Sequence, residues 1–228
     1  MPAVLETISK ELFAGVLLIV VSSYLLGSLN FGVILSNHFA KDDVRNHGSG
    51  NAGTTNMLRS YGKKLALVTI LGDMVKVAVS ILIAYAILKL LGIYDVLEQN
   101  FGNEYQVYVK SFSGFFCVLG HIFPCYFKFR GGKGVATSGG MVFIIDWRIG
   151  LILLAILILI VLVTRYVSLG SIIIALLYPV FIYLFYKSFV LTLIAVVFTL
   201  IVVIAHRGNL KKLINHTENK ISFSKSKK

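Results

Sequence analysis

Long apolar stretches separated by short polar segments dominate this chain. Seven such stretches occur, at residues 12–35, 65–92, 107–123, 135–145, 149–163, 169–186 and 189–205, and the fourth of them is short. A stretch of about 20 apolar residues is long enough to cross a bilayer as a helix, and only helices satisfy the backbone of an open chain in lipid. The pattern therefore predicts an all-α, polytopic membrane protein with about seven transmembrane helices.

Composition agrees with a single integral membrane domain over residues 1–228. Hydrophobic residues make up 57% of the chain and charged residues only 14%, which is more apolar surface than a soluble domain of this length buries. The two cysteines, Cys117 and Cys125, lack the spacing of a metal site and are expected as free thiols. The first apolar stretch is not followed by a small-residue cleavage site, so we expect a retained helix.

The basic residues gather in alternate polar segments, which predicts an orientation. Sixteen of the 22 Lys and Arg residues lie in residues 36–64, 124–134, at Arg165 and in the tail 206–228. The positive-inside rule makes these segments cytoplasmic, with the N-terminus outside and the C-terminus inside. The net charge of +12 thus indicates a membrane surface and not a nucleic acid. The basic end of the tail, residues 222–228, is expected to be disordered beside anionic lipid.

Two glycine-rich segments interrupt the apolar pattern on the predicted cytoplasmic face. Residues 45–59 contain glycines beside hydrogen-bonding and basic side chains, and residues 130–137 place Lys133 among glycines just before a predicted helix start. Backbone N–H groups, a helix N-terminus and an ammonium together favour an anion. The second segment is not a Walker A loop, because the glycine and the Ser or Thr of that motif are missing. The alternatives are a capped flexible loop and a tight turn with a snorkelling lysine.

Several single residues have both a functional and a structural interpretation. Asp73 and Lys76 lie three apart on one helix face inside the second stretch, and we expect an ion pair that supports the site. His121 and His206, at helix ends, could each be a base, a phosphate donor or a structural residue. Ser171 could cap a helix or face the site. The residues from His38 to Asp43 match an HxxxxD acyltransferase pattern once, without a companion motif.

Acidic residues are scarce, and this limits the chemistry. Only ten Asp and Glu residues occur, and no cytoplasmic cluster suits a two-metal phosphotransferase. No GxSxG elbow is present. A metal-free, cationic site rich in hydrogen-bond donors suits an activated acyl donor whose leaving group is phosphate. Such a site has only to bind charge, exclude water and align an alcohol against the carbonyl.

Five motifs, taken in order, resemble the bacterial acyl-phosphate:glycerol-3-phosphate acyltransferases, a family with seven transmembrane helices. The resemblance covers nearly the whole chain. The motifs are Gly27–Gly32, Gly48–Arg59, Gly120–Thr137, Arg165–Ser171 and His206–Asn209 with Thr217–Asn219. The chain departs from the family pattern at Val77 and His216, where glycine is usual, and at Gly208, where an acidic residue is usual.

The resemblance implies transfer of a fatty acyl group from a long-chain acyl phosphate to the sn-1 hydroxyl of glycerol 3-phosphate. The products would be lysophosphatidic acid and phosphate, with no metal or cofactor and with a substrate phosphate helping to deprotonate the hydroxyl. We also expect a monomer in the bacterial inner membrane, with its site on the cytoplasmic face indicated by the basic loops. The catalytic residues implied by motif position are Ser49, Lys133, His206 and Asn209. The substrate-binding residues so implied are Ser49, Arg59, Lys133, Ser171, His206 and Asn209 for glycerol 3-phosphate, and Thr55, Asn56, Gly131, Gly132, Gly134 and Thr137 for the acyl-phosphate head.

Two other classes of protein fit part of this pattern. An organic-phosphate transporter or channel would also use anion-binding segments and several spans, although transporter sites lie near mid-membrane. A metal-dependent lipid phosphotransferase would need more carboxylates than the chain offers. Net solute flux without product would indicate the former, and a requirement for magnesium the latter.

Overall fold

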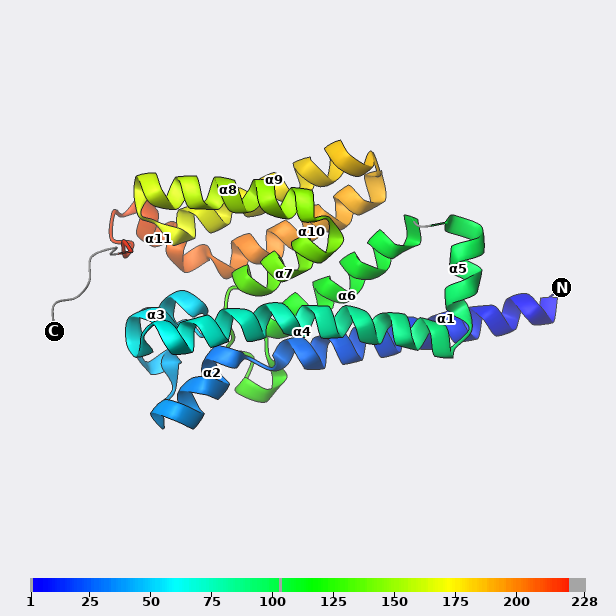
Figure 1. The fold of residues 1–228 in the computed structure, drawn as a ribbon, viewed down its shortest axis with the longest axis horizontal. Coiled ribbons are helices and arrows are strands. Elements are labelled where there is room, and N and C mark those ends of the chain that lie inside the picture. Colours follow the sequence, from blue (N-terminus) through cyan, green and yellow to red (C-terminus); the bar gives the residue numbers. More distant parts are fainter. Residues whose placement is uncertain (1, 103, 222–228) are drawn as a thin grey trace. The chain divides into compact units, whose positions relative to one another are not determined.

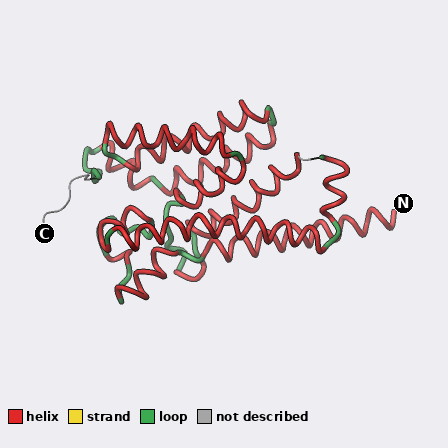
Figure 2. Tube along the Cα trace, viewed as in Figure 1, coloured by secondary structure: helices red, strands yellow, loops and turns green. Residues whose placement is uncertain are grey.

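The computed structural model describes residues 2–102 and 104–221, which form helices and loops and contain no strand (Figure 2). The chain divides into two compact units, Met1–Ile145 and Asp146–Lys228, and each is described by itself. The predicted tail at residues 222–228 lies outside the described residues. The helices of the first unit are α1 (Pro2–Ser28), α2 (Phe31–Leu35), α3 (Thr54–Tyr61), α4 (Lys63–Leu90), α5 (Ile93–Phe101), α6 (Glu104–Ile122) and α7 (Val135–Ile145). Those of the second are α8 (Trp147–Thr164), α9 (Val167–Tyr186), α10 (Phe189–Ala205) and α11 (Arg207–Ile214).

Six of the seven apolar stretches form single helices close to their expected bounds, whereas the first, at residues 12–35, is divided between α1 and α2 by a break at Leu29 and Asn30. Within the described residues, five helical segments are long and apolar enough to cross a membrane, and a sixth is obtained if α10 and α11 count as one span bent by 61°. α7 has 11 residues and is about 16 Å long, which is too short to span alone. The all-α membrane architecture is therefore confirmed.

Three long helices, α1, α4 and α6, pack on one another in the first unit, and α7 packs against α4 and α6 (Figure 1). The ring of Phe31 lies where a side chain on Gly72 of α4 would be, within 2.5 Å of its Cβ position. On α7, Gly140 leaves room for the backbone of Met74, whose Cα and O lie 3.1 Å from the position that a Cβ on this glycine would take. Such close approach of backbones is how helices pack in membranes.

Buried hydroxyl groups join the three long helices. Ser113 of α6 lies with its Oγ 3.1 Å from Ser23 Oγ on α1 and 2.8 Å from Ser80 Oγ on α4. All three residues are buried. Hydrogen bonds between helices stabilise membrane bundles because lipid offers no competing partner.

The second unit is a packed set of three long helices, in which α9 contacts both α8 and α10. Pro179 lies inside α9, and a proline there cannot donate a hydrogen bond to the carbonyl four residues earlier. That carbonyl belongs to Ala175, and Thr199 of α10 donates to it from Oγ1 at 2.7 Å. A neighbouring helix thus satisfies the acceptor that proline leaves without its helical donor.

Candidate active site

Arg45 brings the two glycine-rich segments together at one end of the first unit. Its Nη1 donates to the carbonyl oxygens of Phe127 and Arg130, at 3.0 and 2.8 Å. The rest of its guanidinium is bonded to Asp43, through Nε and Nη2. These hydrogen bonds hold the pKa of the Asp43 carboxyl below its ordinary value. The stabilisation from this pair is therefore present at neutral pH and is lost as the pH falls through the lowered pKa.

Asn56 holds the loop of the first segment in shape through hydrogen bonds to its backbone. It is buried, its Nδ2 lies 2.9 Å from the carbonyl oxygens of Val44, His47 and Asn51, and its Oδ1 accepts from Ser49 N at 2.9 Å. Both ends of its amide are thus engaged in the loop. Asn56, which we expected to bind substrate, is here hydrogen-bonded to the backbone of the loop that carries Ser49.

Two other expected residues of this segment lie on α3. Thr55 is in its first turn and is half-buried, and Arg59 is in its last turn with an exposed side chain. Ser49 is half-buried in the preceding loop. Hydroxyl and guanidinium groups at these places can bind phosphate oxygens.

In the second segment, the N-terminus of α7 and Lys133 offer the donors, while two of the glycines do not. Gly131 N and Gly132 N donate to the carbonyl oxygens of Ile122 and His121, at 3.2 and 3.1 Å. These two glycines therefore could contribute to an anion site only by letting the backbone approach closely, because their N–H groups are already hydrogen-bonded. The N–H groups of the first turn of α7 have no partner within the helix. Thr137 in that turn is fully buried, and its Oγ1 has no hydrogen-bond partner within the part of the chain that is described.

The expected ion pair of Asp73 and Lys76 is present and is buried beneath this segment. Lys76 Nζ lies 2.9 Å from Asp73 Oδ1 and 2.9 Å from Nδ1 of His121. His121 lies at the end of α6 and its carbonyl oxygen holds Gly132. The histidine that the sequence left undecided therefore lies between the ion pair and the glycine loop.

The second unit gathers its own polar residues where α11 meets the start of α9. His206 joins α10 to α11 and is buried. Its Nδ1 lies 2.8 Å from the carbonyl oxygen of Val202. A carbonyl only accepts, so the neutral ring carries its proton on Nδ1 and its lone pair on Nε2. Asn209 Nδ2 donates to Glu218 Oε1 at 2.9 Å, and Ser171 Oγ donates to the Val167 carbonyl at 2.9 Å.

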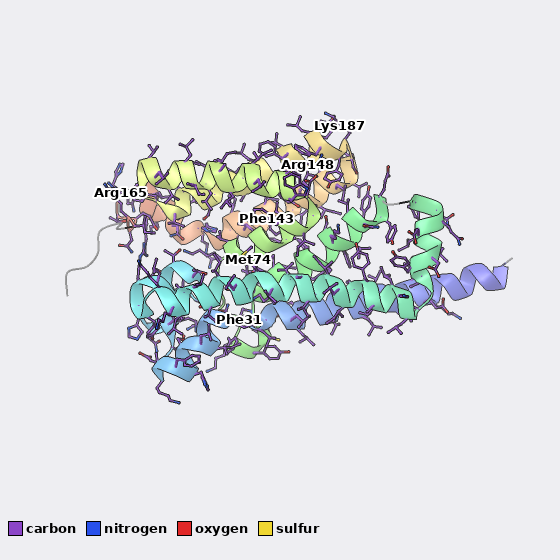
Figure 3. All side chains as sticks on the ribbon, in the orientation of Figure 1. Phe31, Met74, Phe143, Arg148, Arg165 and Lys187 are labelled. Carbon is purple, nitrogen blue, oxygen red and sulfur yellow. The ribbon has the colours of Figure 1, made fainter. Side chains whose placement is uncertain are left out.

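The C-terminal segment is tied to the loop before α9. Ile221 N donates to the Arg165 carbonyl oxygen at 2.8 Å, and the ammonium of Lys220 lies 5.4 Å from the centre of the Tyr166 ring. The labelled Arg165 marks this end of the unit in Figure 3. The motif around Arg165 and the motif around His206 are therefore neighbours, although about 40 residues separate them in the sequence.

The hydrogen bonds by which Arg45 joins the two segments were not predicted, although the sequence carries a signal for its pairing with Asp43. Asp43 and Arg45 are two residues apart, and so are Asp146 and Arg148, which form the same local pair at the start of α8. In both pairs the carboxylate caps a helical turn and receives the guanidinium. The HxxxxD interpretation requires the carboxylate of Asp43, but this carboxylate is bonded to Arg45.

Comparison with known proteins places these motifs in a family. Residues 17–216 match the family model described as glycerol-3-phosphate acyltransferase. A glycerol-3-phosphate acyltransferase of Clostridioides difficile is 38% identical over 216 residues, which cover 94% of this chain and 99% of that protein.

Solved structures agree. The crystal structure of PlsY (YgiH), an integral membrane glycerol 3-phosphate acyltransferase, in its glycerol 3-phosphate form, is 32% identical, with a TM-score of 0.76 over 91% of this chain and 96% of that one. Its lysophosphatidic acid form is 31% identical, with a TM-score of 0.74 over 91% and 95%. Membership of one family therefore accounts for the membrane spans, the glycine-rich segments and the order of the motifs. The chain is an integral membrane protein that belongs to the glycerol-3-phosphate acyltransferase family.

Proposed function

We propose that this protein transfers a fatty acyl group from a long-chain acyl phosphate to the sn-1 hydroxyl of glycerol 3-phosphate. The observation that carries the proposal is the match to PlsY in its glycerol 3-phosphate form over 91% of this chain. The lysophosphatidic acid form of the same enzyme supports lysophosphatidic acid as the product. The family fixes the acceptor class, and the acyl-phosphate donor rests on the chemistry of the site residues.

The reaction exchanges one acyl–oxygen bond for another. The hydroxyl oxygen attacks the acyl carbonyl, the bond from that carbonyl to the phosphate oxygen breaks, and the hydroxyl proton leaves with the phosphate. Phosphate is a good leaving group, so the protein has to hold charge and align the reactants. A substrate phosphate can take the proton, and a protein base is then not required.

The first unit would supply the binding of charge. The Lys133 ammonium and the N-terminus of α7 are suited to phosphate oxygens. Ser49, held by Asn56, and Arg59 on α3 would bind the second anion. Thr55, Gly131, Gly132, Gly134 and Thr137 would shape the cradle for the acyl-phosphate head.

Residues of the second unit would take part in the same reaction. The Nε2 lone pair of His206 can accept a hydrogen bond from a hydroxyl group, and the amide of Asn209, oriented by Glu218, can bind glycerol 3-phosphate, as can the hydroxyl of Ser171. A double-mutant cycle of Lys133→Met with His206→Asn tests this. Strong non-additivity in kcat/KM supports a shared reaction, because independent sites add.

The proposed setting is the cytoplasmic membrane of a bacterium, with the site on the cytoplasmic face and the protein acting as a monomer. The basic loops support this orientation through the positive-inside rule. A cysteine placed at Lys128, which is exposed, should be labelled by an impermeant thiol reagent only after the membrane is opened. Labelling of intact cells would reverse the orientation.

Release of phosphate by the purified protein tests the reaction. Palmitoyl phosphate and glycerol 3-phosphate are supplied in detergent or lipid with a chelator present. Phosphate release that needs glycerol 3-phosphate and equals lysophosphatidic acid formation supports a metal-free acyltransferase. Activity only after magnesium is restored would refute the metal-free mechanism. Solute flux across proteoliposomes without product would favour the transporter.

A further inference from the structure

Asp73 and Lys76 are charged residues inside a membrane-spanning helix, where the proposed reaction does not use them. Their side chains are 1% and 3% exposed, and Oδ1 and Nζ lie 2.9 Å apart. An ionisable pair at this depth is costly, and apolar residues of similar volume often stabilise a buried site equally well. Packing alone is therefore a poor account of the pair.

The other partners of Lys76 define the proton position on His121. Nζ donates to the carbonyl oxygens of Gly27 and Leu29, each at 3.0 Å, and lies 2.9 Å from His121 Nδ1. An ammonium only donates hydrogen bonds, so Nδ1 must accept. Asp73 Oδ1 lies 3.4 Å from the same nitrogen, close enough for the two atoms to share one N–H of the lysine. A neutral imidazole has one N–H, which is then on Nε2.

The position of His121 constrains the backbone of the second glycine-rich segment. Its carbonyl oxygen accepts from Gly132 N at 3.1 Å. On the ring side, a Cβ on Gly132 would come within 2.1 Å of Nε2, and one on Gly131 within 2.0 Å of the carbonyl oxygen. The loop backbone therefore lies directly on the histidine, with no space for a side chain. A tilt of the ring must move the loop and, with it, the adjacent Lys133.

We propose that Lys76 is a positioning residue for acyl transfer. Its ammonium holds His121 as the Nε2–H tautomer, and His121 in turn sets the loop that presents Lys133 and the first turn of α7. The inference rests on the proposed function for its effect on activity, and on the hydrogen bonds of Lys76 for its structural part. The two parts are tested separately.

The double variant Asp73→Leu/Lys76→Met distinguishes positioning from a merely structural ion pair. Lys76→Met alone leaves a buried carboxylate without its partner, so it should lower both the unfolding temperature and kcat/KM. In the double variant that charge is gone, and the unfolding temperature should return to the wild-type value or exceed it. Activity should stay about 10- to 100-fold low in kcat/KM, because the loop remains misplaced. Full recovery of kcat/KM in the double variant would overturn the proposal.

Ser80→Ala is the matched control. Ser80 is a buried polar residue of the same helix, one turn beyond Lys76, and it bonds to Ser113 and not to the loop. Its variant should keep wild-type kcat/KM. A loss as large as that of the double variant would mean that any polar change in this part of α4 impairs activity, which contradicts a specific role for Lys76.

Nuclear magnetic resonance of the wild-type protein, with ¹⁵N-labelled histidine, tests the tautomer without an activity assay. The His121 resonances are those missing from a His121→Asn sample. Coupling patterns showing the proton on Nε2 support the proposal, and a proton on Nδ1 or on both nitrogens refutes it. Wild-type protein that turns over no substrate would refute the proposed function, and this measurement would still decide the contact.

Discussion

Arg45 and Arg130 are joined by a hydrogen bond from a guanidinium to a backbone carbonyl, with Nη1 and the oxygen 2.8 Å apart. The two residues lie 85 positions apart in the chain, each in one of the glycine-rich segments. Since the remaining donors of the guanidinium that are described go to Asp43 and Phe127, Arg45 acts as a brace between the segments. A single side chain therefore links the two glycine-rich segments by hydrogen bonds.

Replacing this brace should impair catalysis more than folding. In Arg45→Lys the charge remains, but an ammonium cannot span a carboxylate and two carbonyls as a planar guanidinium does. We expect kcat/KM to fall about 10- to 100-fold, because small displacements of binding groups are costly. Steady-state kinetics with glycerol 3-phosphate and acyl phosphate, with thermal unfolding in detergent, measure both effects.

Arg148→Lys is the matched control for this brace. Arg148 pairs with Asp146 through the same spacing and the same atoms, but its hydrogen bonds that are described go only to that aspartate. Its side chain is 58% exposed. The variant should keep its activity. An equal loss in both variants would mean that the Arg–Asp pair, and not the bridge to the second segment, is what matters.

Lys133→Ala should abolish most of the activity while the protein stays folded and membrane-inserted. Loss of one charged donor from a preorganised site costs about 100-fold or more in rate, and Lys133 is only half-buried, so its packing contribution is small. Phosphate release and size-exclusion chromatography in detergent are the measurements. Near-normal turnover would remove Lys133 from the site.

His38→Ala should leave activity unchanged. His38 is exposed, with its ring against Phe39, and the carboxylate of Asp43 is bonded to Arg45. Kinetics of this variant under the conditions used for Lys133→Ala measure the effect. Complete loss would restore the HxxxxD acyltransferase interpretation.

Thr199→Val should destabilise the second unit. The variant keeps the shape of the side chain but removes the hydroxyl that donates to Ala175, the carbonyl freed by Pro179. We expect a loss of about 1 kcal/mol, the usual value of such a bond between membrane helices. Thr192→Val is the control, since that hydroxyl bonds within its own helix to Ser188. Equal unfolding temperatures for the two variants would contradict the role of Thr199.

His216→Gly should stabilise the end of α11. His216 has φ of +56°, a left-handed conformation that glycine adopts without steric cost. The surrounding bonds, His216 N to Leu213 O and Thr217 N to Lys212 O, form a Schellman motif, in which glycine is the usual residue. The gain should be about 1 kcal/mol, measured by unfolding in denaturant. His216→Ala keeps a Cβ and should gain nothing, so an equal gain there would argue against backbone strain.

The sequence by itself determined which segments form the long apolar helices and to which family the chain belongs. Six of the seven apolar stretches became single helices near their expected bounds, because in lipid the backbone must satisfy its own hydrogen bonds. The first stretch is broken between α1 and α2. The ion pair of Asp73 and Lys76 also followed from the sequence, since residues three apart on a helix share a face. The family was recognisable because its motifs occur in a fixed order along nearly the whole chain.

Only the tertiary structure decided which polar groups are available and which are already engaged. The side chain of Asn56 looked like a substrate-binding group in the sequence, but its amide nitrogen is hydrogen-bonded to loop carbonyl oxygens. Arg45 looked like any loop arginine, but two of its hydrogen-bond acceptors, the carbonyl oxygens of Phe127 and Arg130, lie more than 80 residues away. His121 acquired its proton position from Lys76 of another helix. Hydrogen bonds between distant segments depend on how helices pack, and local sequence carries no record of them.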